Sequence, residues 1–85
     1  MPKILIIEDD PDISAIERDY LVLSGYEVDI RSDGAAGLAA ALSEDYDLLL
    51  LDLMLPGTDG FTICRAVREK KDIPILMVTA LGKDV

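Results

Sequence analysis

The chain has 85 residues, 51% of them hydrophobic, and its 17 acidic and 8 basic residues give a net charge of −9 without any histidine. This length suits one small domain, no apolar run is long enough to cross a membrane, and the single cysteine excludes an internal disulfide and fits a reducing cytoplasm. So acidic a surface disfavours direct contact with nucleic acid, and without histidine a metal site must rest on oxygen ligands, which suit Mg²⁺, Ca²⁺ or Mn²⁺.

The first third of the chain is typical of two strands joined by a helix. Residues 3–7 form a β-branched apolar run, as in a buried parallel strand. Pro11 favours a helix start with Asp10 as N-cap, and Gly25 is suited to end this helix in a left-handed conformation. Residues 26–31 alternate between apolar and charged side chains, which predicts an edge strand. Four apolar residues share one stripe of the helix: Ile13, Ile16, Tyr20 and Leu21.

Four consecutive leucines, residues 48–51, stand between Asp47 and Asp52. Successive strand residues point to opposite faces, so an unbroken apolar run predicts a strand that is covered on both faces. We therefore expect residues 47–52 to form a central strand of a parallel sheet. Asp52 then lies where this buried strand reaches the surface at its carboxyl end.

Helices are predicted before and after this strand. The first begins at Asp33-Gly34, and the second is capped by Asp59 after a loop of residues 53–58. Residues 75–78 form a fourth apolar strand. The alternation predicts an α/β domain with right-handed βαβ units around a parallel sheet. The residues expected to face inward from the two helices are Leu38, Leu42, Gly60, Ile63, Cys64 and Val67.

Polar groups follow three of the predicted strands: Glu8 and Asp9, then Asp52, then Thr79. The carboxyl ends of parallel strands share one edge, where ligands bind in open α/β sheets. If the strands of residues 3–7 and 47–52 are neighbours, their carboxylates converge and need a divalent cation or a shared proton. A carboxylate can also act as a nucleophile, and a hydroxyl can donate to an oxyanion. Together these groups indicate phosphoryl transfer to Asp52.

Each of these residues also has a purely structural explanation. Asp10 is better explained as a helix cap, and Asp12 as a first-turn charge. Asp52 taken alone fits a loop cap equally well, and Thr79 alone fits a strand-end hydroxyl. Cys64 is better explained as a core residue than as a nucleophile. The coincidence of three polar strand ends favours the functional interpretation.

Three segments, residues 4–11, 47–60 and 74–80, resemble the receiver domain of bacterial two-component response regulators. This family has a flavodoxin-like, doubly wound parallel sheet with strand order 2-1-3-4-5. The resemblance implies that Asp52 accepts a phosphoryl group from a histidine kinase. It implies a switch domain rather than an enzyme, with at most weak self-phosphorylation and dephosphorylation.

The resemblance also implies a set of ligands. Mg²⁺ would be bound by Asp9, Asp52 and the backbone oxygen of Met54, with Glu8 acting mostly through water. Thr79 would contact the phosphoryl oxygen and shift when Asp52 is modified.

Receivers of this family continue with a fourth helix, a fifth strand ending in lysine, and a fifth helix. We expect residues 1–85 to form a single truncated receiver domain without these elements, with metal binding retained and phosphotransfer impaired. Lys83 follows Thr79 too closely to replace the family lysine. An open edge on the strand of residues 75–78 and exposed apolar residues on the first helix, near Ile13, Ile16 and Tyr20, predict a two-fold homodimer.

Two other functions fit the sequence less completely. The chain could be a structural or engineered fragment that assembles as a homodimer and carries an inherited, inactive acidic site. An aspartyl-phosphate hydrolase also uses a strand-end aspartate with Mg²⁺. Its usual second aspartate, two residues after the nucleophile, is missing because position 54 is Met.

Overall fold

The sheet is built around β1 (Lys3–Ile7), which has parallel partners on both sides. The computed structural model describes residues 1–55 and 57–78, and its larger sheet has the strand order β2-β1-β3-β6. The partners of β1 are β2 (Glu27–Arg31) and β3 (Leu48–Asp52), β6 (Ile75–Val78) pairs with β3, and all these pairs are parallel. The strands of residues 3–7 and 48–52 are therefore neighbours, and the predicted doubly wound, flavodoxin-like α/β fold is confirmed.

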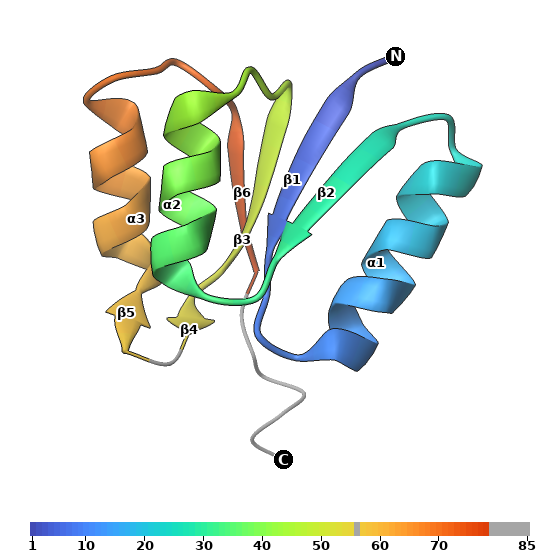
Figure 1. Cartoon of the computed structure of the whole chain (residues 1–85), viewed down its shortest axis with the longest axis horizontal. Coiled ribbons are helices and arrows are strands. Elements are labelled where there is room, and N and C mark those ends of the chain that lie inside the picture. The colour runs from blue at the N-terminus through green and yellow to red at the C-terminus, as the bar shows by residue number, and fades with distance from the viewer. Residues whose placement is uncertain (56, 79–85) are drawn as a thin grey trace.

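Within the described residues, three helices pack on the two faces of this sheet. As Figure 1 shows, α2 (Gly34–Ser43) and α3 (Gly60–Arg68) lie side by side on one face, and α1 (Pro11–Leu23) lies on the other. The predicted N-caps Asp10 and Asp59 are confirmed, and Asp33, predicted to start a helix, is also an N-cap; all three side chains accept backbone N–H groups of the first helical turns. No helix in the described part of the chain is both long and apolar enough to cross a membrane.

The loop predicted at residues 53–58 contains a short antiparallel ladder. Its strands are β4 (Met54–Leu55) and β5 (Thr58–Asp59), and Gly57 between them has a φ of 71°. Strands of two residues are too short to show a hydrophobic period, so the sequence pattern could not predict them. The ladder folds the segment after Asp52 back toward α3.

The main core lies between the sheet and the α2–α3 pair. Leu5, Ile7, Leu49 and Leu51 point into it from β1 and β3, and each is fully buried. Gly37 lets α2 approach closely, since a Cβ there would lie 2.6 Å from Ile7 Cδ1. From the helices and connecting segments the core receives Ala40, Ala41, Tyr46, Leu55, Ile63, Val67 and Ile73. Cys64 packs against this core, as its position on the α3 stripe indicated.

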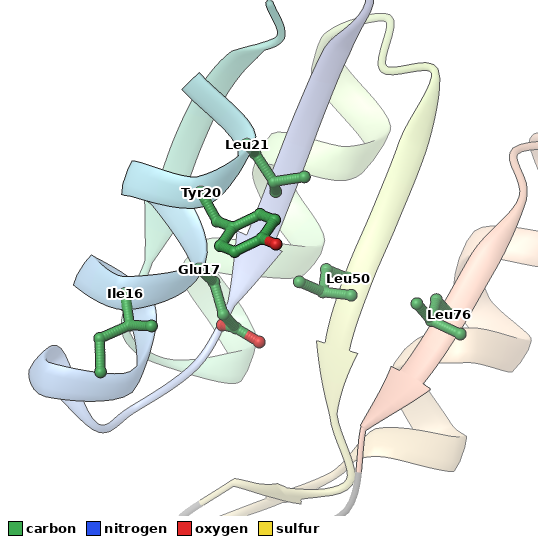
Figure 2. Close-up of a pocket in the computed structure, with 6 residues that line it drawn as sticks. All are labelled: Ile16, Glu17, Tyr20, Leu21, Leu50 and Leu76. Atoms are coloured by element: carbon green, nitrogen blue, oxygen red, sulfur yellow. The ribbon is translucent and has the colours of Figure 1, made fainter. Parts of the chain in front are cut away.

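The opposite face of the sheet is covered only in part. Ile4 and Ile6 of β1 are buried, but Leu50 of β3 is only half-buried and Leu76 of β6 is 56% exposed (Figure 2). The prediction that the four-leucine strand is covered on both faces is therefore wrong within the described residues. The reason is that α1 packs on β1 and β2, at one side of the sheet.

The side of α1 that is buried also differs from the side that its apolar stripe predicted to be buried. Ser14 is the buried residue of this helix, whereas Ile16 is 68% and Tyr20 75% exposed. The expected exposure of apolar surface on this helix is thus confirmed at Ile16 and Tyr20, while Ile13 is half-buried. An apolar stripe predicts a contact but does not say which element provides it.

A polar network ties together the opposite, amino-terminal end of the sheet. Lys3 Nζ lies 2.8 Å from Glu44 Oε1 and 3.8 Å from Asp29 Oδ2. The hydroxyl of Tyr46, a buried residue, donates to Asp29 Oδ2 at 2.7 Å. The hydrogen bond between Lys3 and Glu44 raises the pKa of Lys3 and lowers the pKa of Glu44. The network joins β1, β2 and the loop between α2 and β3.

The first residue of α3, Gly60, is packed against the end of β3. A Cβ at Gly60 would lie 2.9 Å from both the Asp52 carbonyl oxygen and Leu53 Cα. The Gly60 N–H also donates to the Leu53 carbonyl at 3.3 Å. Because both close neighbours are backbone atoms, a side chain at position 60 has to displace the segment that carries Asp52.

Replacing Tyr46 with Phe is expected to lower the free energy of unfolding by about 1 kcal/mol at pH 7, because the hydrogen bond to Asp29 is lost. Burial and that hydrogen bond raise the pKa of Tyr46 above its usual value of 10.0. The folded protein then keeps a proton that the unfolded chain releases, so stability is full below about pH 10 and falls above it.

Urea unfolding of the parent chain and the Tyr46→Phe variant between pH 8 and about pH 11 measures both effects. The parent should lose stability more steeply than the variant as the pH rises. Tyr20→Phe, the same change at an exposed position, should leave the parent profile intact. Parallel profiles for the parent and Tyr46→Phe would contradict the prediction.

Replacing Gly60 with Ala is expected to lower the free energy of unfolding by about 1–3 kcal/mol through overpacking. This loss should appear although alanine is the better helix former. Thr62→Ala, at an exposed position of the same helix, is the matched control and should be neutral or slightly stabilising. Equal stability of the Gly60→Ala variant and the parent in urea unfolding would contradict the prediction. It would show that the backbone at Asp52 and Leu53 can move without a loss of stability.

Candidate metal centre

Three acidic side chains meet at the carboxyl edge of the two central strands. Glu8 and Asp9 follow the end of β1, and Asp52 is the last residue of β3. The strands are in register up to the pair Ile7 and Leu51, so the next residues, Glu8 and Asp52, lie at the same edge of the sheet. One carboxylate oxygen from each of Glu8, Asp9 and Asp52 lies within 4.8 Å of the other two. The structure thus brings together the three acidic residues expected to form the site.

Two of the three carboxylates are almost completely buried. Glu8 is 4% and Asp52 3% exposed, while Asp9 is half-buried. Backbone N–H groups orient both buried side chains: Met54 donates to Asp52 Oδ1 at 3.1 Å, and Asp10 donates to Glu8 Oε2 at 3.0 Å. Acids held this close together repel one another and are costly to bury in their charged form. A cation among them would offset both costs.

The donor set fits a hard divalent ion. All three groups offer carboxylate oxygens, which Mg²⁺ and Ca²⁺ prefer. Oxygens bound to one such ion at 2.0–2.6 Å are separated by at most roughly 4–5 Å. The limit of 4.8 Å among these carboxylate oxygens agrees with that spacing. Asp9 is half-buried, so the cluster is not completely closed to solvent.

The other residues considered for the site divide into three groups. Asp10 is a helix cap, since its Oδ1 accepts from Asp12 N at 2.9 Å and from Ile13 N at 3.4 Å. The Met54 N–H donates to Asp52 Oδ1. The role of the Met54 carbonyl oxygen as a metal ligand stays a prediction. Thr79 lies outside the described residues, so its contact with a phosphoryl group also stays a prediction.

The sequence analysis missed three features that hold the site in place. They are the N–H donors of Asp10 and Met54 and the close packing of Gly60. The first two follow a detectable signal, because an acidic side chain often accepts the N–H two residues later. The sequence placed Gly60 on the inward stripe of its helix, but its close approach to the backbone at Asp52 depends on the position of α3 and could not be predicted.

Solved structures with the same fold include proteins of two-component signalling. One is the response regulator protein TrrA from Thermotoga maritima in complex with Mg²⁺-BeF, with a TM-score of 0.90 and 36% identity over 94% of this chain and 70% of that chain. TrrA in complex with the histidine kinase ThkA has a TM-score of 0.88 at the same identity and coverage.

Similar sequences belong to longer regulatory proteins. The chain is 46% identical over 82 residues to the transcriptional regulatory protein ResD of Bacillus subtilis. It is 50% identical over 86 residues to the DNA-binding dual master transcriptional regulator RpaA of Synechocystis. These matches cover 96% and 98% of the chain but only 34% and 36% of the relatives, so the chain spans about a third of their length.

The match to a family model extends over nearly the whole chain. The model is that of the response regulator receiver domain, and it covers residues 4–85. Domains of this kind are switches in two-component signalling, and they bind Mg²⁺ at an acidic site. The fold, the acidic edge and this match agree, and the chain belongs to the family of response regulator receiver domains.

Proposed function

We propose that the chain is a phosphoacceptor, in which Asp52 receives a phosphoryl group from a histidine kinase while Mg²⁺ is bound by the acidic cluster. The observation that carries this proposal is the convergence of the Glu8, Asp9 and Asp52 carboxylates within 4.8 Å at the end of β3. The complexes of TrrA with Mg²⁺-BeF and with a histidine kinase support it by similarity.

The chemistry follows from a carboxylate nucleophile at a buried strand end. A carboxylate oxygen of Asp52 attacks the phosphorus of the kinase phosphohistidine. The new O–P bond forms as the N–P bond breaks, and the electron pair of the N–P bond returns to the imidazole nitrogen. Mg²⁺, when bound, neutralises charge on the phosphoryl group and on the acids. The Met54 N–H holds Asp52 in a fixed orientation for this step.

The ligand roles extend this proposal residue by residue. Asp9, Asp52 and the backbone oxygen of Met54 would bind the ion directly, and Glu8 would act mostly through water. Thr79 would contact the transferred phosphoryl group and shift upon modification. We further propose that residues 1–85 act as one domain that works in the cytoplasm as a switch rather than an enzyme.

The partners we propose are the kinase and a second copy of the chain. The net charge of −9 argues against direct nucleic-acid contact by this segment, although relatives such as RpaA are named as DNA-binding regulators. Among the described strands, β6 forms one outer edge of the sheet, and its residue Leu76 is an exposed apolar side chain. These two features favour a homodimer. They would equally suit a structural fragment that dimerises around an inherited, inactive acidic site.

Replacing Asp9 with Asn is expected to weaken Mg²⁺ binding by about tenfold or more, because a charged ligand is lost from a site with few protein ligands. Isothermal titration calorimetry measures the affinity. Asp12→Asn removes the same charge from the exposed first turn of α1 and should leave the affinity almost unchanged. Equal affinities for the parent and Asp9→Asn would exclude Asp9 as a ligand.

Incubation with Mg²⁺ and acetyl phosphate is expected to add one phosphoryl group, at Asp52. Intact mass and peptide mass spectrometry locate it, and the Asp52→Asn variant should remain unmodified. The Asp12→Asn variant should be modified like the parent. A phosphoryl group on Asp9, or one that persists in Asp52→Asn, would contradict the assignment of Asp52 as phosphoacceptor.

A further inference from the structure

The amino-terminal end of α2 packs against the ladder that follows the acidic site. Gly34, the first residue of α2, is buried against Thr58 of β5. A Cβ at position 34 would lie 2.7 Å from Thr58 Cβ and 3.0 Å from both Thr58 Cγ2 and Thr58 Oγ1. Carbon atoms in favourable contact lie about 3.5–4.0 Å apart, so only glycine fits position 34 while Thr58 keeps its place.

Thr58 connects α2 with Asp52 through the ladder. It pairs with Leu55, and the next pair of the ladder is Met54 with Asp59. The Met54 N–H in turn donates to Asp52 Oδ1 at 3.1 Å. In Figure 1 the ladder lies at the amino-terminal ends of α2 and α3. A shift of Thr58 therefore reaches the acidic side chain through one pair of two-residue strands.

The ladder should yield to a collision at position 34 before α2 does. α2 has ten residues, and its residues Ala40 and Ala41 are buried in the main core. Through Gly37 the helix also lies directly against Ile7 of β1. β5 has only two residues, and neither of them belongs to that core. Because fewer buried contacts hold β5, we expect a side chain at position 34 to displace Thr58 rather than the helix.

We propose that Gly34 is a positioning residue for the acidic site. Its missing side chain lets Thr58 pack on α2, this contact fixes the ladder, and the ladder holds the Met54 N–H against Asp52. Met54 also carries the backbone oxygen that we propose as a metal ligand. This role rests on the proposed function, since it concerns Mg²⁺ binding and phosphorylation at Asp52.

A role of Gly34 in stability alone would have a different consequence. A side chain at position 34 would then raise the fraction of unfolded protein and leave the folded protein with its full affinity for Mg²⁺. A positioning role requires that the folded protein binds Mg²⁺ less tightly. Stability and affinity therefore have to be measured separately on the same variants.

The first experiment replaces Gly34 with Ala in the 85-residue chain. Isothermal titration calorimetry should give an Mg²⁺ dissociation constant about tenfold higher than that of the parent, as is typical when a group that orients metal ligands is disturbed. Ala39→Gly is the matched control, because Ala39 is exposed and lies more than one turn further along α2. It lowers stability through helix propensity and should leave the dissociation constant almost unchanged. Circular dichroism verifies that both variants are folded during the titration.

The second experiment tests the contact itself with Thr58→Gly. This change removes the Thr58 Cβ, so it loosens the ladder and should itself raise the Mg²⁺ dissociation constant. It also makes room for alanine at position 34. Gly34→Ala should therefore weaken binding in the parent but not in the Thr58→Gly background, and a double-mutant cycle measures this coupling. An equal loss of affinity in both backgrounds would overturn the contact as the cause.

The third experiment needs neither metal nor phosphodonor. In the ¹H–¹⁵N spectrum of the metal-free protein, the Met54 amide proton should move upfield in Gly34→Ala, because its hydrogen bond to Asp52 lengthens. The amide of Asp10 is the internal reference, since it donates to Glu8 Oε2 at 3.0 Å on the other strand end. Its resonance should stay in place. Loss of Mg²⁺ affinity with an unchanged Met54 resonance would overturn the ladder as the route to Asp52.

The outcomes separate the role of Gly34 from the proposed function. A parent that binds Mg²⁺ and a Gly34→Ala variant that binds it equally tightly would overturn the positioning role and leave the phosphoacceptor proposal intact. If Gly34→Ala does not fold, Thr58→Gly decides, and an unchanged affinity in that variant overturns the role. A parent that neither binds Mg²⁺ nor gains a phosphoryl group would overturn the proposed function and this role together.

Discussion

The parallel pairing of β1 with β3 is the interaction on which the rest of the structure depends. Its register aligns Ile7 with Leu51, so the acids that follow each strand emerge at the same place. The apolar residues of the two strands are largely buried, and each fully buried Leu or Ile contributes about 1.5–3 kcal/mol. The free energy gained from this burial is large enough to offset the repulsion and the burial cost of the Glu8 and Asp52 carboxylates. The same residues thus form the core and place the site.

Much of the fold could be predicted because local signals agree with one another. The strands are short apolar runs, and aspartates at positions 10, 33 and 59 mark the helix starts where their side chains indeed accept backbone N–H groups. The acidic edge could also be predicted, because parallel strands with acids at their ends bring those acids together. These inferences need only the hydrophobic pattern of the strands, the N-cap residues of the helices and the parallel direction of the strands.

The features that could not be predicted depend on how elements pack. The ladder of β4 and β5 is too short for a period, and the tight approach of Gly60 to Asp52 follows from the position of α3. The apolar stripe of α1 indicated a buried face, yet Ser14 is buried and Tyr20 is exposed. The stripe is wide, and the sequence does not say which part of it the chain's own sheet covers.

The two faces of the sheet have different consequences for the site. By strand alternation, Leu49 and Leu51 point into the closed core, so Leu50 and Asp52 point toward the face that carries α1. Two residues along a strand separate them by roughly 7 Å. The closed core therefore holds the strand that carries Asp52, while the carboxylate itself lies on the other face, beside Glu8 and Asp9. One apolar strand thus fixes the position of the acidic side chain and keeps it out of the main core.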